Sequence, residues 1–340
     1  MNIIQQDEPK INTWAQHKKL NALVAKHFSV AALGFPALRG RAERMKNCSN
    51  KIVYEIENGA YKYKGASLCR DRLCPICAWR LSIKRTGEMI EIVKEIADKY
   101  PKTKAIHIVL TVKNCMLADL REILKQITTG FTRLKKRQLW RDYILGYMRS
   151  VEITYNAESD SYHPHIHCIA IVPDHYTRQI SVGDWADMWR DSARLNYNPL
   201  VWATQAYRAK PNVEIEQQVY DLERKDGGEG AAAAAIIEAT KYAVKPQGLG
   251  DIAANGDIGE IAYAIQGFRM VSFGGIVKKI RRDLGYTQKD EPEEQLPPIT
   301  ISPAAGIDRY YLVYEWCAHL RSYRPQIIKN GGKEQINLCL

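Results

Sequence analysis

The sequence lacks any long hydrophobic run. None of its apolar stretches reaches the roughly 18 residues that a helix needs to cross a bilayer. Its first ten residues, MNIIQQDEPK, are too polar and too acidic for a signal peptide. These two absences argue against a membrane span and a secretory leader, so we expect a protein of the cytoplasm without a membrane partner.

Acidic residues are also in short supply. The chain of 340 residues has 38 Asp and Glu against 49 Lys and Arg, which gives a formal net charge of +11. Such an excess is typical of proteins that meet a polyanion, although many basic proteins bind none. With 46% hydrophobic residues, the chain can bury the core of one large domain or of two smaller ones.

The sequence contains no convincing internal repeat, and its pattern mixes helices with strands. Helical periodicity covers residues 13–30, 77–100, 117–140, 181–195 and 228–245. Strand patterns cover residues 104–114, 144–156, 162–172, 201–207 and 213–219. Residues 40–85 begin as an irregular basic segment, and residues 288–306 read as a linker before a short element at 310–320. Because neighbouring strands are expected to run antiparallel, the pattern predicts an α+β fold. We expect Trp185 and Trp189, four residues apart, to pack in the core rather than to stack on bases.

Three of the 8 histidines alternate along the stretch HPHIHCIAIV. Side chains of a strand alternate between faces, so His165 and His167 share one face, and His163 joins them if the strand continues through Pro164. If the preceding loop turns at residues 158 and 159, the hairpin register sets Glu152 opposite His165. Two imidazoles with a carboxylate suit a catalytic divalent ion, and either Glu152 or His163 is the third ligand. The alternative is a solvent-facing row of histidines without a metal.

A second group of polar residues lies on the predicted helix IIEATKYAVK. Glu238 and Tyr242 are four residues apart and share a face, and Lys241 and Lys245 flank them. The two lysines are placed to stabilise charge on a phosphate under attack, and Glu238 is placed to act as a general base. Taken alone, a helical tyrosine beside a lysine is more often structural.

The cysteines form the third group. Eight cysteines in a chain expected in the cytoplasm predict metal ligands, core residues or reactive thiols rather than disulfides. Cys69, Cys74 and Cys77 lie within CRDRLCPIC, and Cys48 precedes them in a similar basic stretch. Together they supply four thiolates for a structural Zn²⁺, and the alternatives are a redox-active pair or buried thiols. The basic residues near this cluster are candidates for contacts to DNA phosphates, namely Arg44, Lys46, Arg70, Arg72 and Arg80.

The stretches LTVKN (110–114), HPHIHCI (163–169) and EATKYAVK (238–245) resemble, in this order, the three motifs of the HUH endonucleases. The chain looks most like the single-tyrosine initiators of rolling-circle plasmid replication, from about Cys48 to Lys279. The resemblance implies a central, mainly antiparallel sheet flanked by helices, here preceded by a Cys-rich zinc-binding segment. A relaxase is a weaker match, since it typically carries its tyrosine ahead of the histidine motif.

The resemblance also implies roles for the candidate residues. His165 and His167 would bind a catalytic Mg²⁺ or Mn²⁺, with Glu152 or His163 as the third ligand. Tyr242 would attack the scissile phosphate and leave a 5′-phosphotyrosine and a free 3′-OH, and Glu238 would activate water when replication ends. The expected partners are origin DNA, single-stranded or extruded as a hairpin, and possible host factors such as a helicase and the replication machinery.

These inferences predict three regions and two rival functions. The regions are a helical, Cys-rich DNA-binding segment (1–100), a nicking and joining domain (101–285), and a linker with a C-terminal element (286–340). Within the same chemistry, a single-tyrosine transposase or a relaxase is the rival to a replication initiator. From another class, the rival is a zinc-dependent nucleic-acid-binding regulator without enzymatic activity.

Overall fold

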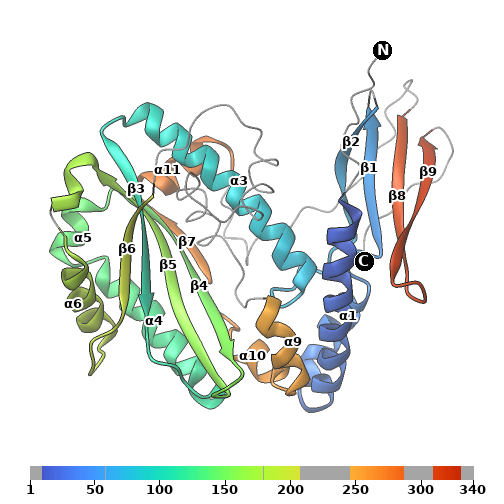
Figure 1. Ribbon diagram of the computed structural model, residues 1–340, viewed down its shortest axis with the longest axis horizontal. Helices are drawn as coiled ribbons and strands as arrows, with labels where there is room; N and C mark the ends of the chain where they lie inside the picture. The colour runs from blue at the N-terminus through green and yellow to red at the C-terminus, as the bar shows by residue number, and fades with distance from the viewer. Residues whose placement is uncertain (1–9, 58, 179, 207–245, 287–308, 331–340) are drawn as a thin grey trace. The chain divides into compact units, whose positions relative to one another are not determined.

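The structure is a computed structural model that describes residues 10–57, 59–178, 180–206, 246–286 and 309–330 (Figure 1). The predicted strand at 213–219, the predicted helix at 228–245 and the predicted linker at 288–306 lie outside these residues. The chain divides into two compact units. The first unit comprises Met1–Trp79, Ala253–Gly259 and Glu294–Leu340, and the second comprises Arg80–Ile252 and Glu260–Glu293.

The first unit combines helices near the start of the chain with a four-stranded antiparallel sheet. Its helical elements are α1 (Ile11–Gly34), η1 (Pro36–Leu38) and α2 (Arg39–Lys46). The strands lie in the order β2 (Ala60–Ala66), β1 (Lys51–Glu57), β8 (Arg309–Cys317) and β9 (Ser322–Asn330). Trp14 of α1 is buried and stacks on Tyr63 of β2, with ring centroids 5.9 Å apart. The prediction of an irregular segment at 40–85 is therefore wrong for the β1–β2 hairpin, and the short element at 310–320 is one strand of a second hairpin.

The second unit is built on a five-stranded antiparallel sheet. The strands lie in the order β6 (Val201–Ala206), β3 (Thr103–Thr111), β5 (Ser161–Pro173), β4 (Gly146–Asn156) and β7 (Val271–Gly274). The helical elements that follow the long helix α3 (Pro75–Lys99) are η2 (Leu117–Asp119), α4 (Leu120–Leu134), α5 (Gln138–Tyr143), η3 (Asp174–Arg178), α6 (Val182–Ala193), α9 (Pro246–Ala254), α10 (Ile258–Ala264) and α11 (Gly275–Asp283). The α+β class, with antiparallel sheets flanked by helices, is confirmed.

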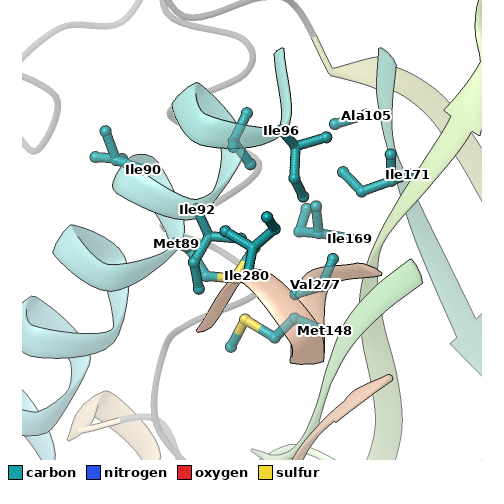
Figure 2. Packing of buried hydrophobic residues seen from close by; sticks show 11 residues of the cluster. Met89, Ile90, Ile92, Ile96, Ala105, Met148, Ile169, Ile171, Val277 and Ile280 are labelled. Atoms are coloured by element: carbon teal, nitrogen blue, oxygen red, sulfur yellow. The ribbon is translucent and has the colours of Figure 1, made fainter. Parts of the chain in front are cut away.

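One face of the five-stranded sheet packs against α3 and α11 (Figure 2). Met148 of β4 and Ile169 of β5 lie opposite each other and face these helices. The helices contribute Ile92 of α3 and Val277 of α11, and all four side chains are buried. This apolar packing fixes the central strands β4 and β5, which continue from it toward the histidines.

The other face of the same sheet packs against α4, α5 and α6. Phe131, Trp140 and Tyr147 form edge-on ring contacts, with centroids 5.4 to 5.6 Å apart. Trp185 and Trp189 of α6 are fully buried, which confirms that they pack in the core. None of the described helices has both the length and the apolar character that crossing a bilayer demands.

Candidate metal centres

The histidine stretch lies on β5, the central strand of the five-stranded sheet. β5 runs without interruption through Pro164, and its pairing with β3 ends next to it, at His165 and Thr111. On the other side, β5 pairs with β4 so that Glu152 lies opposite His165. The register predicted from the hairpin sequence is confirmed. Because the carboxylate and the imidazole come from directly opposed positions of one antiparallel pair, the two side chains lie on the same face of the sheet.

Three donor atoms converge on this face. Glu152 Oε2 lies 3.1 Å from His165 Nε2 and 2.9 Å from His167 Nε2, and the two nitrogen atoms lie 3.0 Å apart. All three residues are buried. Neighbouring ligands of an octahedral ion with bonds of about 2.1 Å are separated by about 3.0 Å, whereas a tetrahedral ion with such bonds separates them by about 3.4 Å. The triangle of Glu152, His165 and His167 therefore fits one face of an octahedron, the geometry that Mg²⁺ prefers.

The hydrogen bonds of His165 show which of its nitrogen atoms is available. His165 Nδ1 lies 3.1 Å from the backbone carbonyl oxygen of His163. A carbonyl oxygen accepts hydrogen bonds and cannot donate them, so Nδ1 must carry the proton. In the neutral ring, Nε2 then keeps its lone pair and directs it toward the other two donor atoms. The backbone of β5 thus prepares His165 to bind a cation.

The two candidates for the third ligand occupy different surroundings. Glu152 completes a group of three potential metal ligands with His165 and His167, whose donor atoms all lie within 4.8 Å of one another. The His163 ring instead forms a hydrogen bond of 2.9 Å between its Nδ1 and Asn114 Oδ1. Burial lowers the pKa of His163, and the neighbouring His165 lowers it further. The geometry thus favours Glu152 and gives His163 a bond to the end of the LTVKN stretch.

The remaining predicted catalytic residues lie outside the described part of the chain. These residues are Glu238, Lys241, Tyr242 and Lys245. Their roles as base, charge stabilisers and nucleophile stay predictions.

The predicted zinc cysteines come together in the first unit. The Sγ atom of Cys48 lies 3.5 Å from those of Cys74 and Cys77, and the Sγ atoms of Cys69 and Cys77 are 3.6 Å apart. All four are free thiols and buried. Four sulfur atoms bound to a tetrahedral Zn²⁺ at about 2.3 Å are separated by about 3.8 Å. The cluster of Cys48, Cys69, Cys74 and Cys77 therefore matches a closed four-sulfur site rather than a disulfide.

Local structure explains how a short sequence gathers these sulfur atoms. Cys48 follows α2, Cys69 follows β2, and Cys74 and Cys77 lie at the start of α3. The backbone N–H of Arg70 donates to Cys77 Sγ at 3.2 Å, and Arg70 adopts a positive φ of 59°. Backbone donors and the start of a helix both stabilise thiolates, as a bound cation requires.

Helix α1 contributes two polar residues that the sequence analysis missed. Asn21 Nδ2 donates to Cys74 Sγ at 3.3 Å. The Lys18 ammonium donates to the backbone oxygens of Lys46 and Cys48 and to Asn50 Oδ1. Lys18 is only 2% exposed. The available signal was a Lys and an Asn three residues apart on the otherwise apolar face of α1.

The thiols of the cluster have displaced pKa values. Burial raises the pKa of Cys48, Cys74 and Cys77. Hydrogen bonds from the three neighbouring thiols lower the pKa of Cys69, which is the site that best holds a thiolate. Four buried thiolates so close together repel one another strongly, and a bound cation is needed to neutralise their charge. Near the cluster in sequence, Arg44, Lys46 and Arg70 are exposed.

Comparisons with known proteins agree with the motifs. Residues 60–324 match the sequence profile of a family described as "Replication protein". The chain is 31% identical to Protein rep of Streptococcus pneumoniae serotype 2 (strain D39 / NCTC 7466) over 267 residues, which cover 74% of this chain and 77% of the relative. It is 29% identical to Protein rep of Bacillus amyloliquefaciens over 286 residues, which cover 81% and 83%.

A further relative is a Replication protein of Staphylococcus aureus, 23% identical over 68% of this chain and 95% of that protein. No solved structure matches the chain. The resemblance to plasmid replication initiators that the sequence motifs suggested is confirmed. The family profile spans well over half of the residues, and this chain belongs to the replication protein family.

Proposed function

We propose that this protein initiates rolling-circle replication of a plasmid by nicking and rejoining one DNA strand at the origin. The observation that carries the proposal is the triangle of Glu152 Oε2, His165 Nε2 and His167 Nε2 in a chain of the replication protein family. Its three donor atoms fit a divalent cation, for which Mg²⁺ and Mn²⁺ are the candidates. A triangle leaves other coordination positions for oxygen atoms of a substrate.

The proposed reaction is a transesterification at phosphorus. Glu152, His165 and His167 would hold a divalent ion, which when bound would polarise the scissile phosphate. Tyr242 contributes the nucleophile: its Oη forms a bond to phosphorus, the bond from phosphorus to the 3′-oxygen breaks, and the phenolic proton ends on the 3′-OH. Lys241 and Lys245 stabilise the negative charge that develops on the phosphate oxygens.

The products explain how one site both opens and closes a strand. A phosphodiester between DNA and Tyr242 replaces the phosphodiester of the strand, so no bond energy is lost and the reaction runs in either direction. The free 3′-OH is a primer for a polymerase. Glu238 is proposed to take a proton from water or a hydroxyl group when the cycle ends.

Binding of DNA is proposed to involve both units. The four-cysteine cluster is proposed to hold Zn²⁺ and to organise exposed basic residues for phosphate contacts, foremost Arg44 and Arg70. The substrate is proposed to be single-stranded or extruded origin DNA, with a host helicase as a further partner. The family is described as a replication protein family, and one relative is named Replication protein, which favours an initiator over a transposase or a relaxase.

The test is to incubate the full-length protein with end-labelled single-stranded origin DNA and Mn²⁺ or Mg²⁺. We expect a covalent protein–DNA adduct that survives denaturation and that disappears in Tyr242→Phe and in His165→Ala. Tyr242→Phe removes only the hydroxyl group, so it controls for DNA binding. If the wild-type protein slows the migration of the DNA in a native gel but forms no covalent adduct, the protein is a non-enzymatic regulator and the proposal is overturned.

A further inference from the structure

A fourth histidine contacts His167 from the neighbouring strand. His107 of β3 lies opposite Ile169 of β5, so its side chain shares the sheet face of His165 and His167. Its Nε2 lies 3.1 Å from His167 Nδ1, and the two rings are nearly parallel, with an interplanar angle of 16°. The contact therefore involves the nitrogen atom of His167 that points away from the donor triangle.

A hydrogen bond between two neutral imidazoles can run in either direction, and the direction decides the chemistry of His167. If His107 donates, His167 Nδ1 is the acceptor, and the single proton of its ring must sit on Nε2. That proton would point at Glu152 Oε2, 2.9 Å away, and would occupy the lone pair that a cation needs. If His167 Nδ1 donates instead, its Nε2 is free to bind.

We infer that His107 is a positioning residue that accepts a hydrogen bond from His167 Nδ1 and so keeps the metal-binding lone pair on His167 Nε2. The inference rests on the proposed metal centre. His107 contacts Nδ1 of His167, so it acts on the proposed metal centre through that imidazole. Partners of this kind orient a ligating imidazole, fix its tautomer and raise its affinity for the metal.

The two metal-binding histidines thereby reach the same state by different means. His165 Nδ1 donates to a backbone carbonyl oxygen of its own strand, at 3.1 Å. Because this acceptor belongs to the main chain, a side-chain substitution does not remove it. His167 depends on a side chain from β3, which substitution can replace. Glutamine preserves an acceptor oxygen at nearly the position of His107 Nε2, whereas leucine fills similar space without any acceptor.

The first experiment measures Mn²⁺ binding to the full-length protein without DNA, by calorimetry or by the electron paramagnetic resonance of free Mn²⁺. We expect His107→Leu to weaken binding by about 10- to 100-fold and His107→Gln to stay within about threefold of the wild type. The matched control is His175→Leu, which removes an exposed histidine of the same unit and should leave the affinity unchanged. His165→Ala should abolish binding at this site.

The outcomes separate the inference from the proposed function. If the wild-type protein binds Mn²⁺ through His165 and His107→Leu binds equally well, the role of His107 is wrong and the metal centre stands. If the wild-type protein binds no Mn²⁺, or His165→Ala binds as tightly as the wild type, the metal centre is wrong and the inference falls with it.

The second experiment reads the tautomer directly and does not depend on metal or activity. Long-range ¹H–¹⁵N correlation spectra of the metal-free, histidine-labelled protein should show His167 with its proton on Nδ1, assigned by the signals that His167→Gln loses. In His107→Leu we expect the population with the proton on Nε2 to increase. An unchanged tautomer in this variant, or a wild-type His167 protonated on Nε2, would overturn the inference.

Discussion

The individual residues of the two metal centres differ in how visible they are from sequence. His165, His167 and Glu152 could be predicted because one hairpin connects them and its register follows from the turn. His107 could not, because a single sequence does not reveal that β3 pairs with β5. Lys18 left only one signal, a polar residue on an otherwise apolar helix face. The cysteines and the basic residues next to them in sequence were found by their spacing, whereas the buried ammonium group of Lys18 was not.

Lys18 provides a test of the proposed zinc centre at the scale of one side chain. Its three hydrogen bonds go to oxygen acceptors, which the three protons of an ammonium group satisfy. Burial lowers the pKa of Lys18, and the charges of the neighbouring cysteines raise it. A Zn²⁺ bound by four thiolates would carry a net negative charge, which this buried cation would offset. We expect Lys18→Met to lower zinc affinity by about 10-fold, measured by competition with a chromogenic chelator.

The control for this prediction is Lys19→Met, which removes the same charge from the exposed face of α1. It should leave zinc affinity unchanged. Equal affinity in Lys18→Met and the wild type would mean that the lysine serves only to join α1 to the backbone near Cys48.

His17 makes the first unit sensitive to acid. Its ring stacks on Trp79, with centroids 4.6 Å apart, and burial lowers its pKa to about 4 from the ordinary 6.5. A group with a lowered pKa takes up its proton more readily after unfolding, so its contribution to stability is complete above pH 6.5 and is lost as the pH falls toward 4. As the pH falls from 6.5 to 4, we expect the free energy of unfolding of the wild-type protein to decrease by up to about 3 kcal/mol because of His17.

The measurement compares thermal unfolding of the wild-type protein and His17→Phe at pH 7 and pH 4.5. Phenylalanine keeps a ring against Trp79 and cannot be protonated. The difference in melting temperature between the two proteins should shift in favour of the variant at the lower pH. A difference that does not change with pH would contradict the assignment.

At the scale of elements, the second unit was easier to predict than the first. Strands β3, β4 and β5 were expected within a few residues of their observed bounds, because long apolar runs identify them. The β1–β2 hairpin was missed although Ile52, Tyr54 and Ile56 alternate and the sequence Asn58-Gly59 favours a tight turn. Apolar Val53 stands between Ile52 and Tyr54, so the alternation is incomplete and a half-buried strand is harder to recognise from sequence.

The packing of α4 on α6 gives a prediction for one pair of elements. A Cβ atom added at Gly130 of α4 would lie 2.8 Å from the Cα atom of Ala193 in α6. Alanine has a higher helix propensity than glycine by about 1 kcal/mol. We nevertheless expect Gly130→Ala to destabilise the protein by about 1 to 3 kcal/mol, because two backbones must separate.

Chemical denaturation measures this effect, and Gly183→Ala is the matched control. The added Cβ of that variant meets only Ser181 Oγ, at an ordinary 3.5 Å, so stability should be unchanged or slightly higher. A Gly130→Ala protein as stable as Gly183→Ala would show that the two helices separate without cost.

At the scale of the whole molecule, the two candidate metal centres belong to different compact units. We therefore expect them to load independently. Cys74→Ser should reduce zinc content while Mn²⁺ affinity stays within about threefold, and His165→Ala should do the reverse, because additivity holds for sites that share no ligands. Elemental analysis and Mn²⁺ titration measure the two contents, and joint loss of both ions in either variant would contradict independence.

Sequence patterns could not predict which strands form the sheet of the first unit. The α+β class and the antiparallel pairing follow from local periodicity. The pairing of β1 with β8 joins residues 51–57 to residues 309–317, and no local signal links such distant strands. The predicted regions 1–100, 101–285 and 286–340 stay predictions, and the sheet of the first unit draws strands from the first and the last of them.

The pairing of β1 with β8 has a consequence for biosynthesis. Ribosomes deliver the chain from its N-terminus, so β1 emerges long before the strand that completes its sheet. Strands β3 to β6 all lie between Thr103 and Ala206, so their pairing joins segments much closer in sequence than β1 and β8, which favours early assembly. The nascent protein should therefore assemble its Glu152, His165 and His167 triangle while β1 and β2 are still an open hairpin. A ribosome that stalls before residue 309 would release a chain in which the edge of β1 that pairs with β8 is uncovered.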